Sequence, residues 1–63
     1  MKVTIEIQCD NAAFGEDEYG QSVEVARILD ALVDDLTQVS AVPAMKKLYD
    51  INGNKVGQMV VAQ

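Results

Sequence analysis

The sequence predicts a small α+β domain with the element order strand, helix, strand, strand. Three observations lead to this fold class. Apolar and polar residues alternate near the N-terminus, an apolar stripe with helical spacing follows, and Asn52-Gly53 separates two strand-like segments. A sheet and an amphipathic helix each bury one face, so we expect a three-stranded sheet with the helix packed on one side. The chain has 63 residues, of which 49% are hydrophobic, and residues 1–63 are expected to form a single domain.

The first strand is expected over residues 2–9, where side chains alternate strictly. An apolar side is opposed to a polar side: Val3, Ile5, Ile7 and Cys9 against Lys2, Thr4, Glu6 and Gln8. This is the pattern of a strand with one buried face. A loop over residues 10–21 is expected next. In it, Asp10 or Asn11 is placed to cap a single turn that carries Phe14 into the core, and the acidic segment after Phe14 should be exposed.

The helix is expected to begin with Ser22 as its N-cap and Glu24 in its first turn, where the helix dipole favours an acid. Its apolar stripe recurs at spacings of three and four residues: Val25, Ile28, Leu29, Leu32, Leu36 and Val39. The opposite, polar face contains Glu24, Arg27, Asp30, Asp34, Asp35 and Gln38. The helix must end before Pro43, because the residue that precedes a proline avoids helical geometry.

The last part of the sequence predicts a hairpin of residues 44–51 and 54–62. Its turn has two interpretations. A two-residue turn at Asn52-Gly53 pairs Ile51 with Asn54, whereas a type I turn that closes in a glycine bulge at Gly53 pairs Asp50 with Asn54. We favour the second, because Asp50 and Gly53 occupy the positions where this turn prefers them and because two apolar residues, Leu48 and Val56, then lie opposite each other.

Two strand orders are open. If the first strand lies beside the last, the sheet is wholly antiparallel, and if it lies beside the second, a right-handed parallel crossover results. We favour the first order, with the third strand central, because Lys46 and Lys47 suit an edge and Val60-Val61 suits the middle of a sheet.

The expected core follows from these faces: Val3, Ile5, Ile7, Phe14, Val25, Ile28, Leu29, Leu32, Leu36, Leu48, Val56 and Val60. The sheet face turned away from the helix should keep some of Met45, Tyr49, Met59 and Val61. An exposed apolar sheet face commonly marks an interface. We therefore expect a weak or moderate homodimer, which light scattering at high micromolar concentration would detect.

The charge of the chain is divided unequally. Residues 1–40 carry nine of the ten acids and two of the five cations, a net charge of −7, whereas residues 41–63 carry a net charge of +2. This distribution argues against binding to bare nucleic acid or to an anionic membrane, and favours a basic protein partner. The single cysteine, the lack of a signal-peptide pattern and the short apolar runs predict a cytoplasmic protein.

The sequence contains no catalytic signature, and we expect a protein that is not an enzyme and needs no cofactor or metal. There is no histidine, so the commonest general base and metal ligand is missing. Cys9 lies at the end of a buried strand face, where a packing role is expected. The segment Asp50–Asn54 is similar to the start of a calcium loop, but the sixth position is Lys55 instead of glycine, and the twelfth is Val61 instead of glutamate.

The candidate functional residues form an acidic patch. Its expected members come from the loop and from the polar face of the helix: Glu16, Asp17, Glu18, Asp30, Asp34 and Asp35. Asp30 and Asp34 repel each other at a spacing of four residues. An ordinary solvated face would explain these acids. The functional alternative is a strip that fits a basic groove, because carboxylates on neighbouring turns lie about 5–6 Å apart at Cβ, which is comparable to successive phosphates.

Three fragments occur in an order that resembles small proteins encoded in bacteriophage and prophage genomes. They are Asp10-Asn11-Ala12-Ala13-Phe14, Glu24-Val25-Ala26-Arg27-Ile28-Leu29, and Leu48 to Gly57 with its Asp50-Ile51-Asn52-Gly53-Asn54 turn. The resemblance implies a fold and a phage origin, and no active site. Small acidic phage proteins include anti-CRISPR inhibitors that occupy the DNA-binding cleft of a host defence complex. The resemblance therefore suggests DNA mimicry in the bacterial cytoplasm. The alternative is a structural or accessory phage protein that oligomerises or binds a host protein through its hairpin.

The incomplete calcium loop and the lack of histidine give a first prediction. Adding millimolar calcium should leave the melting temperature unchanged, because a ligand that binds only the folded state must stabilise it. A rise of several degrees that a chelator reverses would contradict this prediction.

Overall fold

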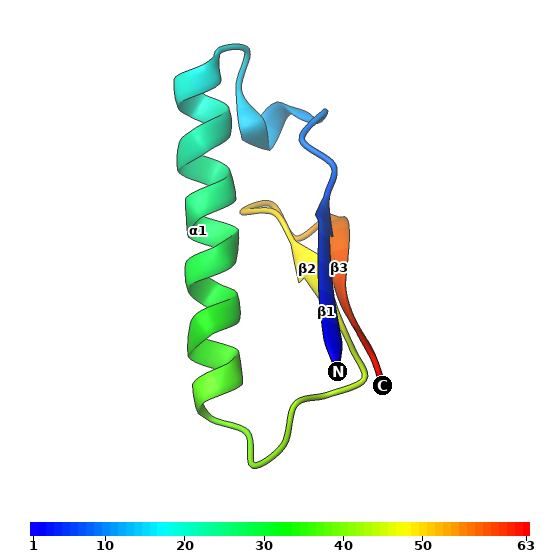
Figure 1. The fold of residues 1–63 in the computed structure, drawn as a ribbon. Helices are drawn as coiled ribbons and strands as arrows, with labels where there is room; N and C mark the ends of the chain where they lie inside the picture. The colour runs from blue at the N-terminus through cyan, green and yellow to red at the C-terminus, as the bar shows by residue number, and fades with distance from the viewer.

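The computed structural model describes residues 1–63 and confirms the predicted fold class. Its elements are β1 (Lys2–Ile7), the short 3-10 helix η1 (Ala12–Phe14), α1 (Glu18–Thr37), β2 (Met45–Tyr49) and β3 (Lys55–Ala62). The three strands form one antiparallel sheet in the order β1-β3-β2, and α1 lies along one face of it (Figure 1). The third strand is central, as the sequence predicts. No helix has the length and apolar character needed to cross a bilayer.

The prediction that Ser22 caps the helix is wrong, because the N-cap lies five residues earlier and α1 begins at Glu18. Asp17 is the N-cap, and its Oδ1 accepts a hydrogen bond from the backbone N–H of Gly20 at 2.7 Å. A Cβ on Gly20 would lie 3.1 Å from the carbonyl oxygen of Phe14. Glycine at this position therefore lets the first helical turn lie against the end of η1. The helix ends at Thr37, ahead of Pro43 as expected.

Of the two candidate caps in the first loop, Asn11 is the one that caps η1. Its Oδ1 accepts a hydrogen bond from the N–H of Ala13 at 2.9 Å. Phe14 is completely buried, as predicted. The short turn thus fixes the largest side chain of the core between α1 and the sheet.

The hairpin has the type I turn with a glycine bulge. The N–H of Gly53 donates to the carbonyl of Asp50 at 3.0 Å, the N–H of Asp50 donates to the carbonyl of Asn54 at 2.9 Å, and Gly53 has a φ of 85°. The expected Leu48–Val56 pair is wrong. Leu48 lies opposite Gly57 and Tyr49 lies opposite Lys55. Val56 is therefore the extra residue of a β-bulge, and its side chain enters the core.

The core is smaller than the sequence predicts. Six apolar residues are buried: Phe14, Ile28, Leu32, Leu48, Val56 and Met59. Four residues expected in the core are instead 38–44% exposed: Val3, Ile5, Leu29 and Val60. Val60 lies on the outer face of the sheet, where it pairs with Thr4 and Met45, whereas Met59 and Val61 lie on the helix side and not on the outer face.

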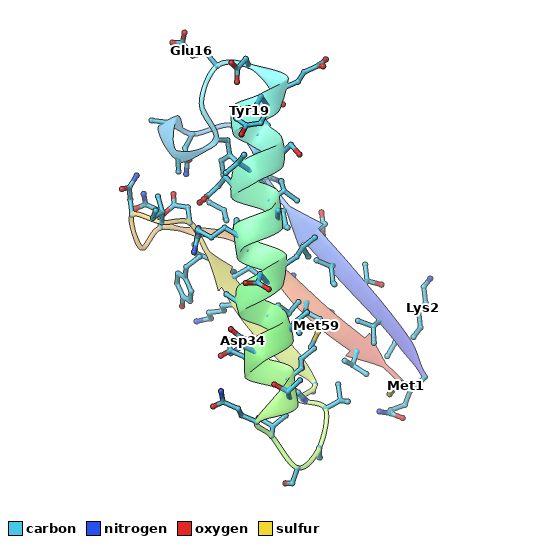
Figure 2. All side chains as sticks on the ribbon, turned by 90° about the vertical axis from the view of Figure 1, so that its left-hand side faces the viewer. Met1, Lys2, Glu16, Tyr19, Asp34 and Met59 are labelled. Atoms are coloured by element: carbon cyan, nitrogen blue, oxygen red, sulfur yellow. The ribbon has the colours of Figure 1, made fainter.

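The exposure of Val3 and Ile5 has a geometric cause. A helix is about 10 Å wide and strands lie about 4.8 Å apart, so one helix covers roughly two strands. Arg27, Ala31 and Asp35, on one flank of α1, line a groove shared with β2. The helix therefore lies over β2 and β3, and β1 lies to its side (Figure 2).

These positions predict the effect of truncating the core. Leu32→Ala should lower the free energy of unfolding by about 2–5 kcal/mol, because it removes a buried side chain from a six-residue core. The matched control is Val33→Ala, whose side chain is 56% exposed and should change stability little. Denaturant unfolding of both variants measures the difference. Equal midpoints would remove Leu32 from the core.

Candidate functional site

An ion pair between the buried carboxylate of Glu24 and the half-exposed guanidinium of Arg27 joins α1 to the hairpin. Glu24 is 5% exposed, and its carboxylate accepts two hydrogen bonds from the guanidinium of Arg27, at 2.8 and 3.1 Å. Glu24 Oε2 also accepts the backbone N–H of Ile51 at 2.9 Å, and Arg27 Nη2 donates to the carbonyl of Tyr49 at 3.1 Å. The expected place of Glu24 on the polar face opposite the apolar stripe is therefore wrong, because its carboxylate is buried, whereas the side chain of Arg27 stays 37% exposed. The two side chains hold the backbone on either side of Asp50, at the β2 end of the hairpin turn.

Asp50 is the first residue of the turn and is 4% exposed. Its Oδ1 accepts the backbone N–H groups of Asn52 and Asn54 at 2.9 and 2.8 Å. Its Oδ2 accepts the side-chain amides of Asn11 and Asn54 at 2.7 and 3.3 Å. The carboxylate thus orders the turn and also joins it to the cap of η1. We call Asn11, Glu24, Arg27, Asp50 and Asn54 the hairpin network.

The electrostatics of the hairpin network favour its charged forms. The hydrogen bonds from Arg27 hold the pKa of Glu24 below its ordinary value, against the opposing effect of burial. For Asp50, burial on its own would raise the pKa, but the hydrogen bonds from Asn54, Asn11 and Asn52 together lower it. No buried polar side-chain atom lacks a partner. The network is therefore satisfied as it stands, and its chemistry is structural.

The hairpin network also connects three separate segments of the chain, residues 10–14, 24–29 and 48–57. Asn11 comes from the first segment, Glu24 and Arg27 from the second, and Asp50 and Asn54 from the third. Segments that are far apart in the sequence thus meet at one point. The sequence signal was an i, i+3 acid–base pair, Glu24 and Arg27, at the border of the apolar stripe, and only the tertiary fold shows what it contacts.

The structure divides the six acidic-patch residues between three places. Glu16, Asp17 and Glu18 lie at the N-terminal end of α1, where Asp17 is the N-cap. Asp30 and Asp34 are exposed, and Asp34 lies on the helix face turned away from the sheet, with Glu16 beyond the start of the helix (Figure 2). Asp35 is on the flank towards β2, where it forms an ion pair with Lys46 at 3.1 Å.

Apolar side chains are interspersed with these acids, a feature that sequence reasoning missed. Tyr19, Val23 and Val33 are 78%, 52% and 56% exposed. Together with Ala26 and Asp30 they recur at spacings of four and three residues, which places them along one stripe of the helix. We call the stripe, together with Glu16, Glu18 and Asp34, the outward surface of α1. It combines negative charge with apolar contact area.

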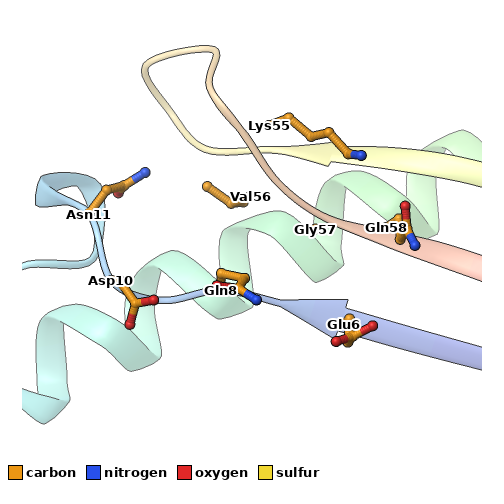
Figure 3. Close-up of a pocket in the computed structure, with 8 residues that line it drawn as sticks. All are labelled: Glu6, Gln8, Asp10, Asn11, Lys55, Val56, Gly57 and Gln58. Carbon is orange, nitrogen blue, oxygen red and sulfur yellow. The ribbon is translucent and has the colours of Figure 1, made fainter.

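A shallow hollow lies over the junction of β1 and β3. It has a volume of about 480 Å³ and is lined almost entirely by polar residues (Figure 3): Glu6, Gln8, Asp10, Asn11, Lys55, Val56, Gly57 and Gln58. Gly57 is required here, because a Cβ would overlap the carbonyl oxygen of Glu6 on the neighbouring strand. The hollow is wide and shallow, and it has the amides and carboxylates of a solvated sheet surface.

No group of three or more acidic or cysteine side chains is gathered as a metal site. In the turn that is similar to a calcium loop, both carboxylate oxygens of Asp50 accept N–H donors. Cys9 is half-buried against the core, with its Sγ 3.7 Å from the carbonyl oxygen of Ile7. The outward surface of α1 is therefore the strongest candidate for function, as a binding surface.

Comparison with known proteins adds no relative from which a site could be transferred. No protein-family model matches the chain, and no curated protein or solved structure matches it significantly. The chain is thus defined by its own features: an α+β domain with a three-stranded antiparallel sheet, one helix, and an acidic outward surface.

The lowered pKa of Glu24 predicts the response of stability to acid. A carboxyl whose pKa is lower in the folded chain stabilises the fold above its unfolded pKa, and this contribution is lost as the pH falls through the folded value. Wild-type stability should therefore decline as the pH drops below the ordinary value of 4.5. Glu24→Gln should be less stable at neutral pH and should show a shallower decline in acid.

Denaturant unfolding across this pH range measures both slopes. The matched control is Asp30→Asn, which removes an exposed carboxylate with no ion-pair partner and should keep the wild-type slope. Parallel curves for wild type and Glu24→Gln would show that the ion pair of Glu24 does not link protonation to folding.

Proposed function

We propose that this protein is a non-catalytic acidic inhibitor that binds a basic protein surface through the outward surface of α1. One observation carries the proposal. Two cations beside the helix, Arg27 and Lys46, are engaged by Glu24 and Asp35, and these are the only ion pairs in the structure. The remaining carboxylates on and before the helix have no cation to neutralise them: Glu16, Asp17, Glu18, Asp30 and Asp34. The charged residues of the outward surface of α1 are therefore all negative.

Such a surface acts first on the rate of association. A field of one sign steers the encounter with a positive groove, and the steering weakens with salt. Asp30 and Asp34, on adjacent turns, place carboxylates at about the separation of successive phosphates. The surface can thus occupy a site that binds nucleic acid. Tyr19, Val23 and Val33 add apolar contact area, from which protein partners gain affinity that phosphates do not supply.

The resemblance to phage proteins suggests the class of partner. An acidic protein of this size that offers no chemistry would inhibit by occupancy, and the basic nucleic-acid-binding site of a host defence complex is the target that fits its charge. On this proposal the protein acts in the manner of an anti-CRISPR DNA mimic. It binds the host protein, and not nucleic acid or a membrane.

A second candidate function uses the hairpin. Met45, Tyr49 and Ile51 are 48%, 49% and 67% exposed on β2 and its turn. A structural or accessory phage protein that binds a host protein through this apolar edge would depend little on salt, because its contact area is not charged. The dependence of partner binding on salt therefore separates the two candidates.

The first experiment identifies the partner by affinity capture from host lysate, followed by mass spectrometry. Capture should be sensitive to salt, and duplex DNA or RNA added in excess should compete with it. With the isolated partner, the doubly reversed variant Asp30→Lys, Asp34→Lys should associate about tenfold or more slowly, with a flatter dependence on salt. Stopped-flow or surface-plasmon measurements give these rates.

A matched control separates the effect of charge on the outward surface of α1 from the effect of the net charge of the protein. The triple variant Gln8→Lys, Asp10→Lys, Gln63→Lys adds the same four charges at exposed positions away from α1. It should associate far faster than the doubly reversed variant. If both variants bind as fast as wild type, or if nucleic acid does not compete, the acidic surface is not the binding site and the hairpin edge becomes the better candidate.

A further inference from the structure

The outer edge of β1 is open for pairing. β1 is an edge strand of the sheet, and the N–H of Gln8 just beyond it donates to the carbonyl of Val56 on the β3 side at 2.7 Å. In an antiparallel ladder, alternate residues direct both their N–H and C=O groups to the same neighbour. The even-numbered residues of β1 therefore face β3. The N–H and C=O groups of Val3, Ile5 and Ile7 point to the free edge.

Two apolar side chains of β1 are exposed beside its unpaired backbone groups. Val3 and Ile5 lie on the helix side of the sheet, yet they are 44% and 43% exposed, because α1 lies over the other two strands. An edge strand with unpaired backbone groups and apolar side chains is a template for pairing with another strand. Nothing within the chain covers it.

We propose that β1 pairs with β1 of a second copy of this chain, in an antiparallel dimer whose twofold axis passes beside Thr4. Since residues opposite each other then sum to eight, Lys2 faces Glu6 of the partner subunit, and Glu6 faces the partner's Lys2. On the helix side of the sheet, Val3 faces Ile5 of the partner subunit, and Ile5 faces the partner's Val3. The edge strand β1 is thus self-complementary: opposite charges meet on one face of the sheet, and apolar side chains meet on the other.

The charges select this register from those that the backbone allows. Pairing of the outward-directed groups requires odd-numbered residues to face odd-numbered residues. A twofold axis at Val3 would set Lys2 opposite Thr4, and one at Ile5 would set Lys2 opposite Gln8. Only the axis at Thr4 places opposite charges across the junction, twice. Opposite charges directly across an antiparallel pair are stabilising, and like charges are destabilising.

The dimer has a defined architecture. Side chains directly opposite each other in an antiparallel pair point to the same face, so the two sheets become one six-stranded sheet with both helices on the same side. The interface differs from the sheet face that the sequence suggested, because it uses the edge of β1. It leaves the outward surface of α1 free in both copies, so it does not depend on the proposed function.

The test is a charge exchange between the two members of the pair. Sedimentation velocity of the wild type should show a dimer that forms with rising protein concentration. Lys2→Glu and Glu6→Lys should each turn two attractions into two repulsions and raise the dissociation constant by about tenfold or more. An equimolar mixture of these two variants should dimerise again, because each junction then joins a glutamate to a lysine.

Control variants change charge at exposed sites that are off the junction. Lys47→Glu and Asp10→Lys match the two test variants in charge and should dimerise like wild type. Hydrogen exchange of the wild type gives a measurement without mutation, since the amides of Val3 and Ile5 should gain protection as concentration rises. A wild type that stays monomeric at high micromolar concentration would overturn the proposal. So would single variants that associate as wild type, a mixture that does not pair, or unchanged exchange at Val3 and Ile5.

Discussion

The fold depends on one carboxylate, that of Glu24, which Arg27 and the N–H of Ile51 hold between the helix and the hairpin. The apolar core has only six buried residues, so it supplies few contacts that fix how the hairpin sits against α1. A buried charge costs several kcal/mol in lost hydration, and this is offset only where its hydrogen bonds are complete. Here they are complete, so the position of the hairpin is determined by geometry as well as by apolar burial.

The acids of this chain have two physical roles. Glu24, Asp50 and Asp17 accept hydrogen bonds that shape the helix start and the turn. Others, among them Glu16, Glu18, Asp30 and Asp34, have no such task and face solvent. Because Glu24 takes up the guanidinium of Arg27, these exposed carboxylates are left without an ion-pair partner. The surface that could attract a basic partner is thus a result of how the interior is held together.

Periodicity in the sequence predicted the elements, whereas the types of residue predicted the strand order and the turn. Lys46 and Lys47 indicated an edge strand and hence the central third strand, and Gly53 indicated the glycine-bulge turn. The contacts between elements did not follow in the same way. Glu24 and Asp50 were assigned to the surface and to a simple turn, because nothing nearby in the sequence shows that an arginine and backbone N–H groups will surround them. The alternation of apolar and polar residues correctly placed Val3 and Ile5 on the helix side of the sheet. How far these side chains are buried depends on where the helix lies, which alternation does not show. Ser22 and Asp17 both have side chains that can cap a helix. In the structure Asp17 is the cap, and Gly20 lies close to the carbonyl oxygen of Phe14, a contact that the local sequence does not show.

The pairing of β1 with β3 has a consequence for the topology of the chain. Lys2 lies opposite Ala62, so the two termini end side by side on neighbouring strands (Figure 1). A short linker from Gln63 to Met1 would close the backbone into a ring without bending either strand. New ends could then be opened in the exposed connection between α1 and β2, over residues 38–42. The same closeness would allow the domain to be inserted into a surface loop of another protein, with both junctions at one corner of the sheet.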